Sequence, residues 1–186
     1  MQANIEFGSN GTPLYILNTS DYANWLGNQT DAAQQWLKTS GFSGSGLALV
    51  PAINGQLESA AFFSSEPSHL FACADLAKLL PTQAFNLKAD DNTCLNAAIA
   101  FGLAQYKFDQ YKPAPDEQAT LVIHNQSTVD QAQKFIEATY LVRDMINTPA
   151  SDMMPENMSS FVQSIAKEFD ATFSEIVGDD LLKQNY

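Results

Sequence analysis

A long apolar helix between Ser127 and Asn147 restricts the fold of this chain more than any other stretch. Ser127 or Thr128 can cap its start. One side of its first half is expected to face inward, with Val129, Ala132, Phe135, Ile136 and either Thr139 or Tyr140 at helical spacing. Its second half, up to Ile146, is apolar around most of its circumference, and such a helix is covered on more than one side. We therefore expect it to lie between two domains and to end before Pro149, because proline disfavours helical geometry in the preceding residue.

Before this helix, predicted strands and helices alternate, which indicates an α/β fold. Strands are expected at residues 13–17, 46–53, 56–63, 69–73, 84–88 and 119–124, and helices at residues 31–38, 75–80 and 91–106. Asp31 is expected to cap the first of these helices. Asn54-Gly55 tolerates the positive φ of a type I′ turn and so predicts a β-hairpin. Three- and four-residue steps between apolar residues from Leu95 to Tyr106 indicate an amphipathic helix.

After the long helix, the pattern predicts a shorter one that begins at Pro155, which suits the first helical position. Its apolar residues form one stripe, made of Met158, Phe161, Val162, Ile165 and Phe169. A strand is expected at residues 171–177 and the start of a last helix at residues 178–185.

Acidic residues outnumber basic ones, which argues against some partners. The chain of 186 residues has 21 Asp and Glu and nine Lys and Arg, for a net charge of −12. A phosphate backbone would be repelled, so no nucleic-acid partner is expected. No run reaches the ~18 apolar residues of a membrane span, and no export signal is recognisable. We expect a cytoplasmic protein in which Cys73 and Cys94 are buried, reduced thiols.

The polar residues that could carry chemistry form no recognisable site. His69 and His124 stand far apart in sequence and outside any metal-binding motif, so structural roles are favoured. Asp90-Asp91 and Asp179-Asp180 adjoin predicted helix starts, where carboxylates act as caps and complement the helix dipole.

The stretch Gly41–Gly46 (GFSGSG) is rich in glycine. It precedes a predicted strand, whereas a dinucleotide-binding loop follows a strand and opens a helix. Ser43 and Ser45 lie outside a Gly-x-Ser-x-Gly nucleophile motif. We expect this stretch to be a turn between a helix and a strand.

The segment from Arg143 to Pro155, RDMINTPASDMMP, resembles the leucine (cytosol) aminopeptidase family, in which a long helix ends in such a segment at the junction of two domains. Leu79-Leu-Pro81, Tyr106-Lys-Phe108 and Gly178–Lys183 are also similar to that family. The resemblance implies a macro-like α/β domain with a mixed sheet at residues 1–126, a connecting helix at residues 127–147, and the truncated start of the peptidase domain at residues 148–186.

For the whole enzyme, the resemblance implies a metal-dependent leucyl aminopeptidase that removes N-terminal residues from peptides with two zinc or manganese ions. The family's metal ligands lie in a Gly-Lys-Gly-x-x-Phe-Asp-like strand and an Asn-Thr-Asp-Ala-Glu-Gly-Arg-Leu signature. Neither motif occurs between Met1 and Tyr186. We therefore assign no catalytic or metal-binding residue and no cofactor to this chain, and we expect it to be inactive alone.

Oligomer assembly and domain docking are the roles that the resemblance implies for this segment. Its expected partners are its own catalytic domain and other subunits of a homo-oligomer, a hexamer in the family. Arg143, the only arginine, is a candidate for an ion pair between domains. Asn147 and Asp152 are expected to satisfy backbone groups at a helix end and to cap the next helix. The alternative is a free-standing macro-like module for a nucleotide or ADP-ribose-type ligand, with Gly41–Gly46 as its candidate loop.

Overall fold

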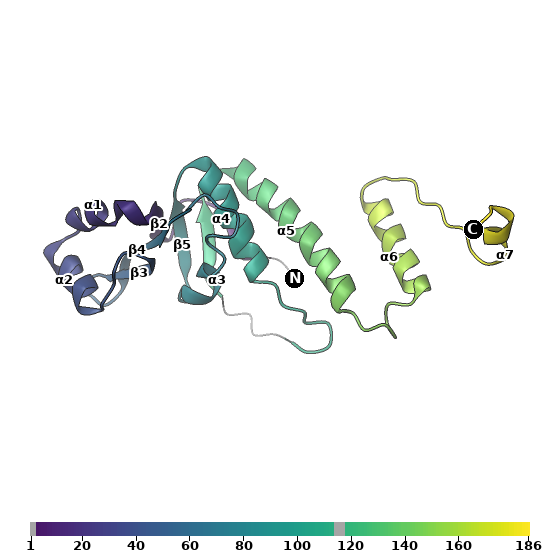
Figure 1. Ribbon diagram of the computed structural model, residues 1–186, viewed down its shortest axis with the longest axis horizontal. Helices are drawn as coiled ribbons and strands as arrows, with labels where there is room; N and C mark the ends of the chain where they lie inside the picture. The colour runs from purple at the N-terminus through teal and green to yellow at the C-terminus, as the bar shows by residue number, and fades with distance from the viewer. Residues whose placement is uncertain (1–2, 114–117) are drawn as a thin grey trace. The chain divides into compact units, whose positions relative to one another are not determined.

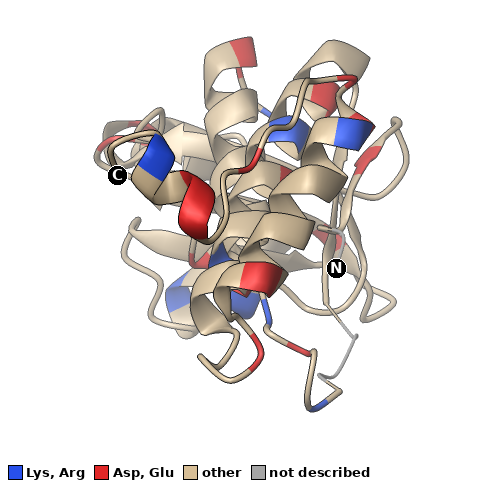
Figure 2. Ribbon diagram, turned by 90° about the vertical axis from the view of Figure 1, so that its right-hand side faces the viewer, with Lys and Arg blue, Asp and Glu red and all other residues tan. Residues whose placement is uncertain are grey.

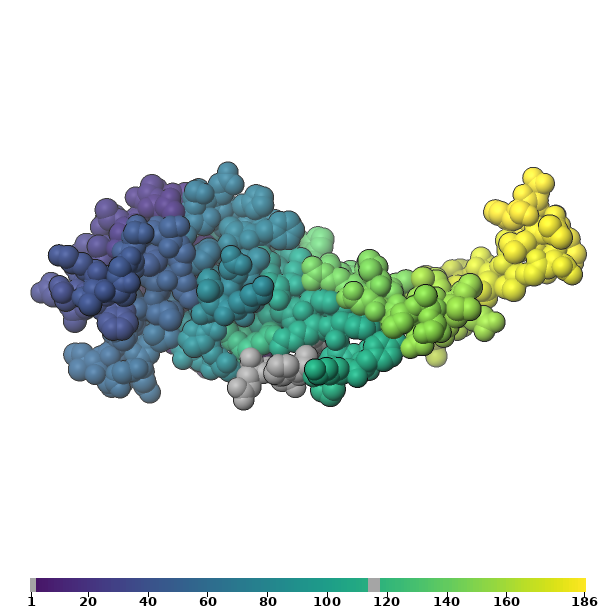
Figure 3. All heavy atoms as spheres, turned by 60° about the horizontal axis from the view of Figure 1, so that its bottom comes forward, coloured from purple at the N-terminus to yellow at the C-terminus, as the bar shows by residue number. Residues whose placement is uncertain are grey.

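The computed structural model describes residues 3–113 and 118–186 (Figure 1). Contacts within the chain define two compact units, residues 1–141 and residues 142–186. The first unit contains the sheet, and its described residues run from purple through teal to green in Figure 3. Each unit is described by itself below.

A six-stranded sheet forms the first unit, in the order β1-β6-β5-β2-β4-β3. The strands are β1 (Ile5–Phe7), β2 (Thr12–Asn18), β3 (Gly46–Pro51), β4 (Leu57–Ser64), β5 (Ala84–Lys88) and β6 (Thr120–Ile123). All neighbouring strands pair in parallel except β3, which is antiparallel to β4. The predicted α/β class with a mixed sheet is confirmed, although the pattern did not predict the short strand β1.

Helices cover both faces of this sheet. The 3₁₀ turn η1 (Thr19–Asp21), α1 (Tyr22–Gly27) and α2 (Asp31–Thr39) belong to the connection from β2 to β3 and cover one face. The helices α3 (Leu76–Leu79), α4 (Asp91–Ala104) and α5 (Gln126–Asn147) cover the other. The connections from β4 to β5 and from β5 to β6 join parallel strands and move in the same direction along the sheet, and both lie on the face of α3 and α4, as crossovers of one hand require.

Only four residues, Gly8 to Gly11, connect β1 to β2, and we call them the strap. They cross β6 and β5 on the face opposite α4. The Gly8 N–H donates to the Ile123 carbonyl at 3.0 Å, and the side chain of Asn86 donates to the Ser9 carbonyl. A Cβ at Gly11, where φ is +112°, would stand 2.8 Å from the Ala84 carbonyl oxygen. Glycine is therefore required where the strap lies directly on the sheet.

Helix α4 is buried around most of its circumference rather than along one stripe. Eight of its residues are buried: Thr93, Cys94, Ala97, Ala98, Ile99, Ala100, Phe101 and Gly102. The prediction of an amphipathic helix here is wrong, because α4 packs on the sheet on one side and on α5 on another. Small side chains such as Ala98 and Gly102 allow that close approach.

The first half of α5 is anchored in the same core. Val129, Ala132, Ile136 and Tyr140 are buried as predicted, whereas Phe135 is exposed. The Tyr140 hydroxyl donates to the Gly102 carbonyl of α4 at 2.5 Å. Asn125, rather than Ser127 or Thr128, caps the helix: its Oδ1 accepts from the Ser127 N–H at 3.0 Å. Likewise Thr30, rather than Asp31, caps α2.

The hairpin between β3 and β4 forms as predicted, with a register shift between Val50 and Pro51. Its turn is not type I′, because Gly55 has a positive φ (+81°) and Asn54 does not. Ala52 N–H donates to the Gln56 carbonyl at 2.7 Å and Gly55 N–H to the Ala52 carbonyl at 3.0 Å. This is a three-residue turn with glycine in the left-handed position.

Residues 69–73, predicted as a strand, form consecutive turns instead. They belong to the connection between the parallel strands β4 and β5, where a crossover passes over the sheet and has no strand to pair with. The short helix α3 that follows was predicted.

The second unit contains α6 (Pro155–Glu168) and α7 (Asp179–Lys183), both predicted, with Pro155 at the start of α6. The strand predicted at residues 171–177 is absent from this described region, since these residues pair with no other strand. No residue of α6 or α7 is buried. None of the helices formed by residues 3–113 and 118–186 has the length and apolar character to cross a membrane.

Candidate functional site

The two histidines occupy separate, exposed positions. His124 follows β6, whereas His69 lies in the turns after β4, where its Nδ1 accepts from the Phe71 N–H at 3.3 Å. Its ring packs against that of Phe71 with centroids 6.2 Å apart. His69 thus stabilises a local turn.

The acid pairs act at helix starts. Asp90 caps α4: its Oδ1 accepts from the Thr93 N–H at 3.0 Å and its Oδ2 from the Thr93 hydroxyl at 2.6 Å. The hydroxyl of Thr93, and then its N–H, lower the pKa of Asp90 because both stabilise the charged carboxylate. Asp180 forms an exposed ion pair with Lys183, one turn along α7, at 2.5 Å. These contacts support the structural roles expected from the sequence.

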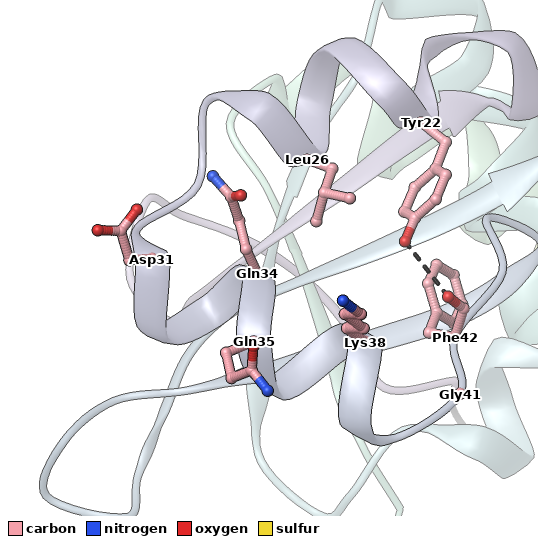
Figure 4. Close-up of a pocket in the computed structure, with 8 residues that line it drawn as sticks. All are labelled: Tyr22, Leu26, Asp31, Gln34, Gln35, Lys38, Gly41 and Phe42. Atoms are coloured by element: carbon pink, nitrogen blue, oxygen red, sulfur yellow. Dashed lines mark hydrogen bonds between the residues drawn. The ribbon is translucent and has the colours of Figure 1, made fainter.

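The loop Gly41–Gly46 lies at the carboxyl edge of the parallel strands, because β3 is antiparallel and Gly46 pairs with Phe63. Its place in sequence, ahead of a strand, therefore did not exclude a ligand-binding position in the fold. The space beside Gly44 is nevertheless filled. A Cβ at Gly44, where φ is +92°, would lie 2.5 Å from the Tyr22 ring, and the Tyr22 hydroxyl donates to the Phe42 carbonyl at 3.3 Å (Figure 4).

Aromatic rings surround this contact. Phe63 of β4 lies with its ring centroid 5.4 Å from that of Tyr22 and 5.3 Å from that of Trp25, both edge to face. The glycines of the loop thus let its backbone pack against the Tyr22 ring, and they give no support to a nucleotide-binding role. Ser43 and Ser45 are exposed.

Outside this cluster, α1, α2 and the start of the loop surround a hollow of about 500 Å³ (Figure 4). Asp31, Gln34, Gln35 and Lys38 project around it from α2. These groups comprise one acid, one base and two amides, so they make neither a nucleophile with its base nor a set of metal donors.

Both thiols are buried in the core. Burial raises the pKa of Cys73 to about 12 and also raises that of Cys94, so neither is a thiolate at neutral pH. The prediction that they are buried, free cysteines is confirmed.

Metal-binding groups do not converge anywhere in the described chain. No three side chains of His, Cys, Asp or Glu lie together among residues 3–113 and 118–186. A two-metal peptidase centre requires several such donors around each ion, so the side chains described here do not fit one. Basic residues, drawn blue in Figure 2, are scattered over several elements of the ribbon, as are the acidic residues drawn red.

The junction residues lie at the end of α5. Arg143 and Asp144 are half-buried, and the Thr148 hydroxyl donates to the Asp144 carbonyl at 2.7 Å, which satisfies a backbone group at this helix end. The residue at the N-cap of α6 is Met154, so the expectation that Asp152 occupies that position is wrong. Asp152 accepts from the Ser151 hydroxyl at 3.1 Å.

Comparison with known proteins identifies this architecture. The sequence model of the M17 aminopeptidase N-terminal domain matches residues 12–124. The chain belongs to the M17 aminopeptidase family. The family resemblance inferred from residues 143–155 is therefore confirmed by a match over a different part of the chain.

Solved structures agree with this assignment. The cytosol aminopeptidase of Coxiella burnetii is 31% identical, with a TM-score of 0.89 over 96% of this chain. The bottromycin maturation enzyme BotP in complex with Mn (17% identity, TM-score 0.67) and tomato leucine aminopeptidase (14%, 0.65) share the fold. Among curated proteins, a probable cytosol aminopeptidase of Clostridium perfringens is 26% identical over 92 residues.

The chain spans only part of these relatives. It covers 41% of the Coxiella protein and 46% of the tomato protein, and its alignment with the Clostridium protein covers 19% of that protein's length. The similarity is therefore to the N-terminal domain of M17 cytosol aminopeptidases.

Proposed function

We propose that this chain is the non-catalytic N-terminal portion of a two-metal leucyl aminopeptidase that removes N-terminal residues from peptides. The match of residues 12–124 to the family's N-terminal domain carries this proposal. The described residues provide no cluster of metal donors, and a relative of this fold is a complex with Mn. The zinc or manganese ions would accordingly be bound by another part of the enzyme, and no chemical step is assigned to these residues.

The chain's role in the proposed enzyme is docking and assembly. We divide it into an N-terminal domain (residues 1–126), a connecting helix (127–147) and the beginning of the peptidase domain (148–186). The apolar stripe of α6 supports the last of these, because Met158, Val162 and Phe169 are 38%, 43% and 72% exposed. Such a stripe normally packs on a core, and the rest of a peptidase domain would supply one.

We further propose that the enzyme assembles into a homo-oligomer, a hexamer as the family resemblance implies, and that it is located in the cytoplasm. Arg143 is the candidate for an ion pair between domains or subunits, since it lies at the junction and a guanidinium can bind a carboxylate through two parallel hydrogen bonds.

A direct assay tests the catalytic part of this proposal. The chain alone, supplied with zinc or manganese, is incubated with a leucyl amide, and released leucine is measured. The Coxiella cytosol aminopeptidase serves as the positive control under the same conditions. We expect no release above the rate without protein. Metal-dependent release by this chain would overturn the proposal that it is non-catalytic.

A further inference from the structure

Two Asn-Gly pairs in the chain are held by the fold in different ways. Asn10-Gly11 belongs to the strap, and Asn54-Gly55 forms the tip of the β3–β4 hairpin. In such a pair the backbone nitrogen of glycine can reach the asparagine side-chain carbon, because glycine has no Cβ to obstruct the approach. We propose that Asn54 is a site of spontaneous deamidation in the folded protein and that the strap protects Asn10.

The hairpin tip is exposed to solvent. Asn54 and Gly55 are exposed, and the preceding Ile53 is as exposed as in an extended chain, at 105%. No heavy atom outside the neighbouring residues lies within 4 Å of the position where Gly55 would carry a Cβ. The turn can therefore change its backbone geometry without displacing any part of the core.

The side chain of Asn54 is already directed along the backbone towards Gln56. Its Oδ1 accepts from the Gln56 N–H at 3.0 Å, and its Nδ2 donates to the Gln56 Oε1 at 3.1 Å. This turn folds the carboxamide back over the peptide of Gly55. The N–H donor on Oδ1 also draws electron density from the carbonyl carbon, which makes it a better electrophile.

One local contact opposes the reaction. The Gly55 N–H donates to the Ala52 carbonyl at 3.0 Å, and this bond must open before the nitrogen can attack. It belongs to a solvent-exposed turn, where local opening needs little free energy.

Asn10 is exposed as well, but its neighbours are fixed. Gly8 donates to the Ile123 carbonyl, Asn86 donates to the Ser9 carbonyl, and Gly11 lies against the backbone of Ala84. Closing a ring between Asn10 and Gly11 would turn the Gly11 peptide and lift the strap from β5. Ring closure at Asn10 must therefore begin with the loss of contacts between the strap and the sheet. The hairpin tip has no such contacts to lose.

The reaction requires only water and a base. The Gly55 nitrogen gives its proton to hydroxide and forms a bond to Cγ of Asn54; the Cγ–Nδ2 bond breaks, and Nδ2 leaves as ammonia with a proton from water. Hydrolysis of the resulting succinimide yields an aspartyl or an isoaspartyl residue at position 54. Either product adds a negative charge at physiological pH, and the isoaspartyl form also lengthens the main chain of the turn.

This change falls beside a hollow of about 650 Å³, whose lining includes Gly55 and Gln56 of the hairpin, and Thr12 and Gln83 at the amino ends of β2 and β5. A new carboxylate at the tip therefore alters both the charge and the shape of one wall of this hollow.

Peptide mapping distinguishes the two pairs. The folded chain is incubated at mildly alkaline pH, and samples are digested with trypsin after each interval. Asn54 is the only asparagine between the cleavage sites at Lys38 and Lys78, whereas Asn10 lies in the peptide that ends at Lys38. Mass spectrometry then measures replacement of NH₂ by OH in each peptide, with fragment ions to assign the position.

We expect Asn54 to deamidate at least about tenfold faster than Asn10 in the folded chain, a factor set by the contacts that the strap must lose. In urea the two rates should converge. Asn54→Gln should abolish the early charge change seen by ion exchange, and Asn10→Gln should leave it unchanged. Equal rates in the folded chain, an unmodified Asn54, or a difference that persists in urea would each overturn the proposal.

Discussion

The contact between α4 and α5 depends on a glycine, and Gly102→Ala is the sharpest test of it. A Cβ at Gly102 would lie 2.3 Å from Cδ1 and 3.0 Å from Cγ1 of Ile136, and 3.2 Å from Cδ1 of Ile5. The closest of these atoms ends a side chain that is itself only 1% exposed, so it has little free space to move into. The added methyl group must therefore displace Ile136 or separate the two helices.

Two opposing contributions determine the magnitude. Overpacking a well-filled core costs about 1–3 kcal/mol, whereas alanine gains about 0.8–1.0 kcal/mol over glycine in a helix interior. Because a contact of 2.3 Å is far inside van der Waals distance, we take the upper part of the first range, about 2–3 kcal/mol, and expect a net destabilisation of about 1–2 kcal/mol. Ile136→Val removes the atom at 2.3 Å, so the double variant should be more stable than Gly102→Ala alone, with a coupling energy of about 1–2 kcal/mol.

Urea unfolding followed by tryptophan fluorescence measures these differences. Both tryptophans, Trp25 and Trp36, lie within residues 1–141, so the signal reports on the unit that contains the contact. Gly27→Ala at the end of α1 is the matched control, because nothing lies within 4 Å of its Cβ position. A Gly102→Ala chain as stable as the wild type, or one that Ile136→Val does not rescue, would refute this account of the packing.

Two further substitutions test the helix cap and the junction. Asp90→Ala should lower the free energy of unfolding by about 0.5–2 kcal/mol at neutral pH. Because hydrogen bonds lower the pKa of Asp90 in the folded state, its contribution is present above the unfolded pKa of about 3.9 and disappears as pH falls through the folded pKa. The loss of stability caused by Asp90→Ala should therefore be smaller in urea titrations at acid pH than at neutral pH. An equal loss at both pH values, or an equal loss in Asp91→Ala, would contradict the assignment of Asp90 as the cap of α4. Arg143→Ala in the intact enzyme should lower the melting temperature or weaken assembly, by about 1–3 kcal/mol for a partly buried charge-assisted bond; unchanged sedimentation and melting would exclude its proposed ion pair.

An element could be predicted from the sequence where the spacing of its apolar residues matches the way it is buried in the fold. The central strand β6 reads as one apolar run because it lies between β1 and β5 and is covered on both faces. The sequence predicted the helix α4 but not the extent of its burial. Small residues such as Ala97 and Ala100 contribute little to a stripe of large apolar residues, so these positions were not recognised as buried. Only the packing of α5 on α4 shows that these positions are core.

Contacts between distant segments were the least predictable feature. The strap is rich in Gly, Ser and Asn, and β1 beside it has only three residues. Local propensity therefore indicates a loop, and only pairing with β6 makes Ile5–Phe7 a strand. Gln105 also carried no signal, yet it is 3% exposed and joins two segments: its Oε1 accepts from the Asn4 N–H and its Nε2 donates to the Ala119 carbonyl. Helix caps were misplaced by one to three residues, because several adjacent polar residues could serve equally well in isolation.

The connecting helix links the fold to the proposed role. Its first half is fixed by Ile136 and Tyr140 in the core of the first unit, whereas Val142 and Ile146 in its second half are 51% and 75% exposed. Residues four apart face the same side of a helix, and Met145 between them faces another side, so one neighbour cannot cover all three. The Coxiella relative extends well beyond the 41% of its length that this chain covers. On the function proposed above, the rest of the peptidase domain provides the second surface.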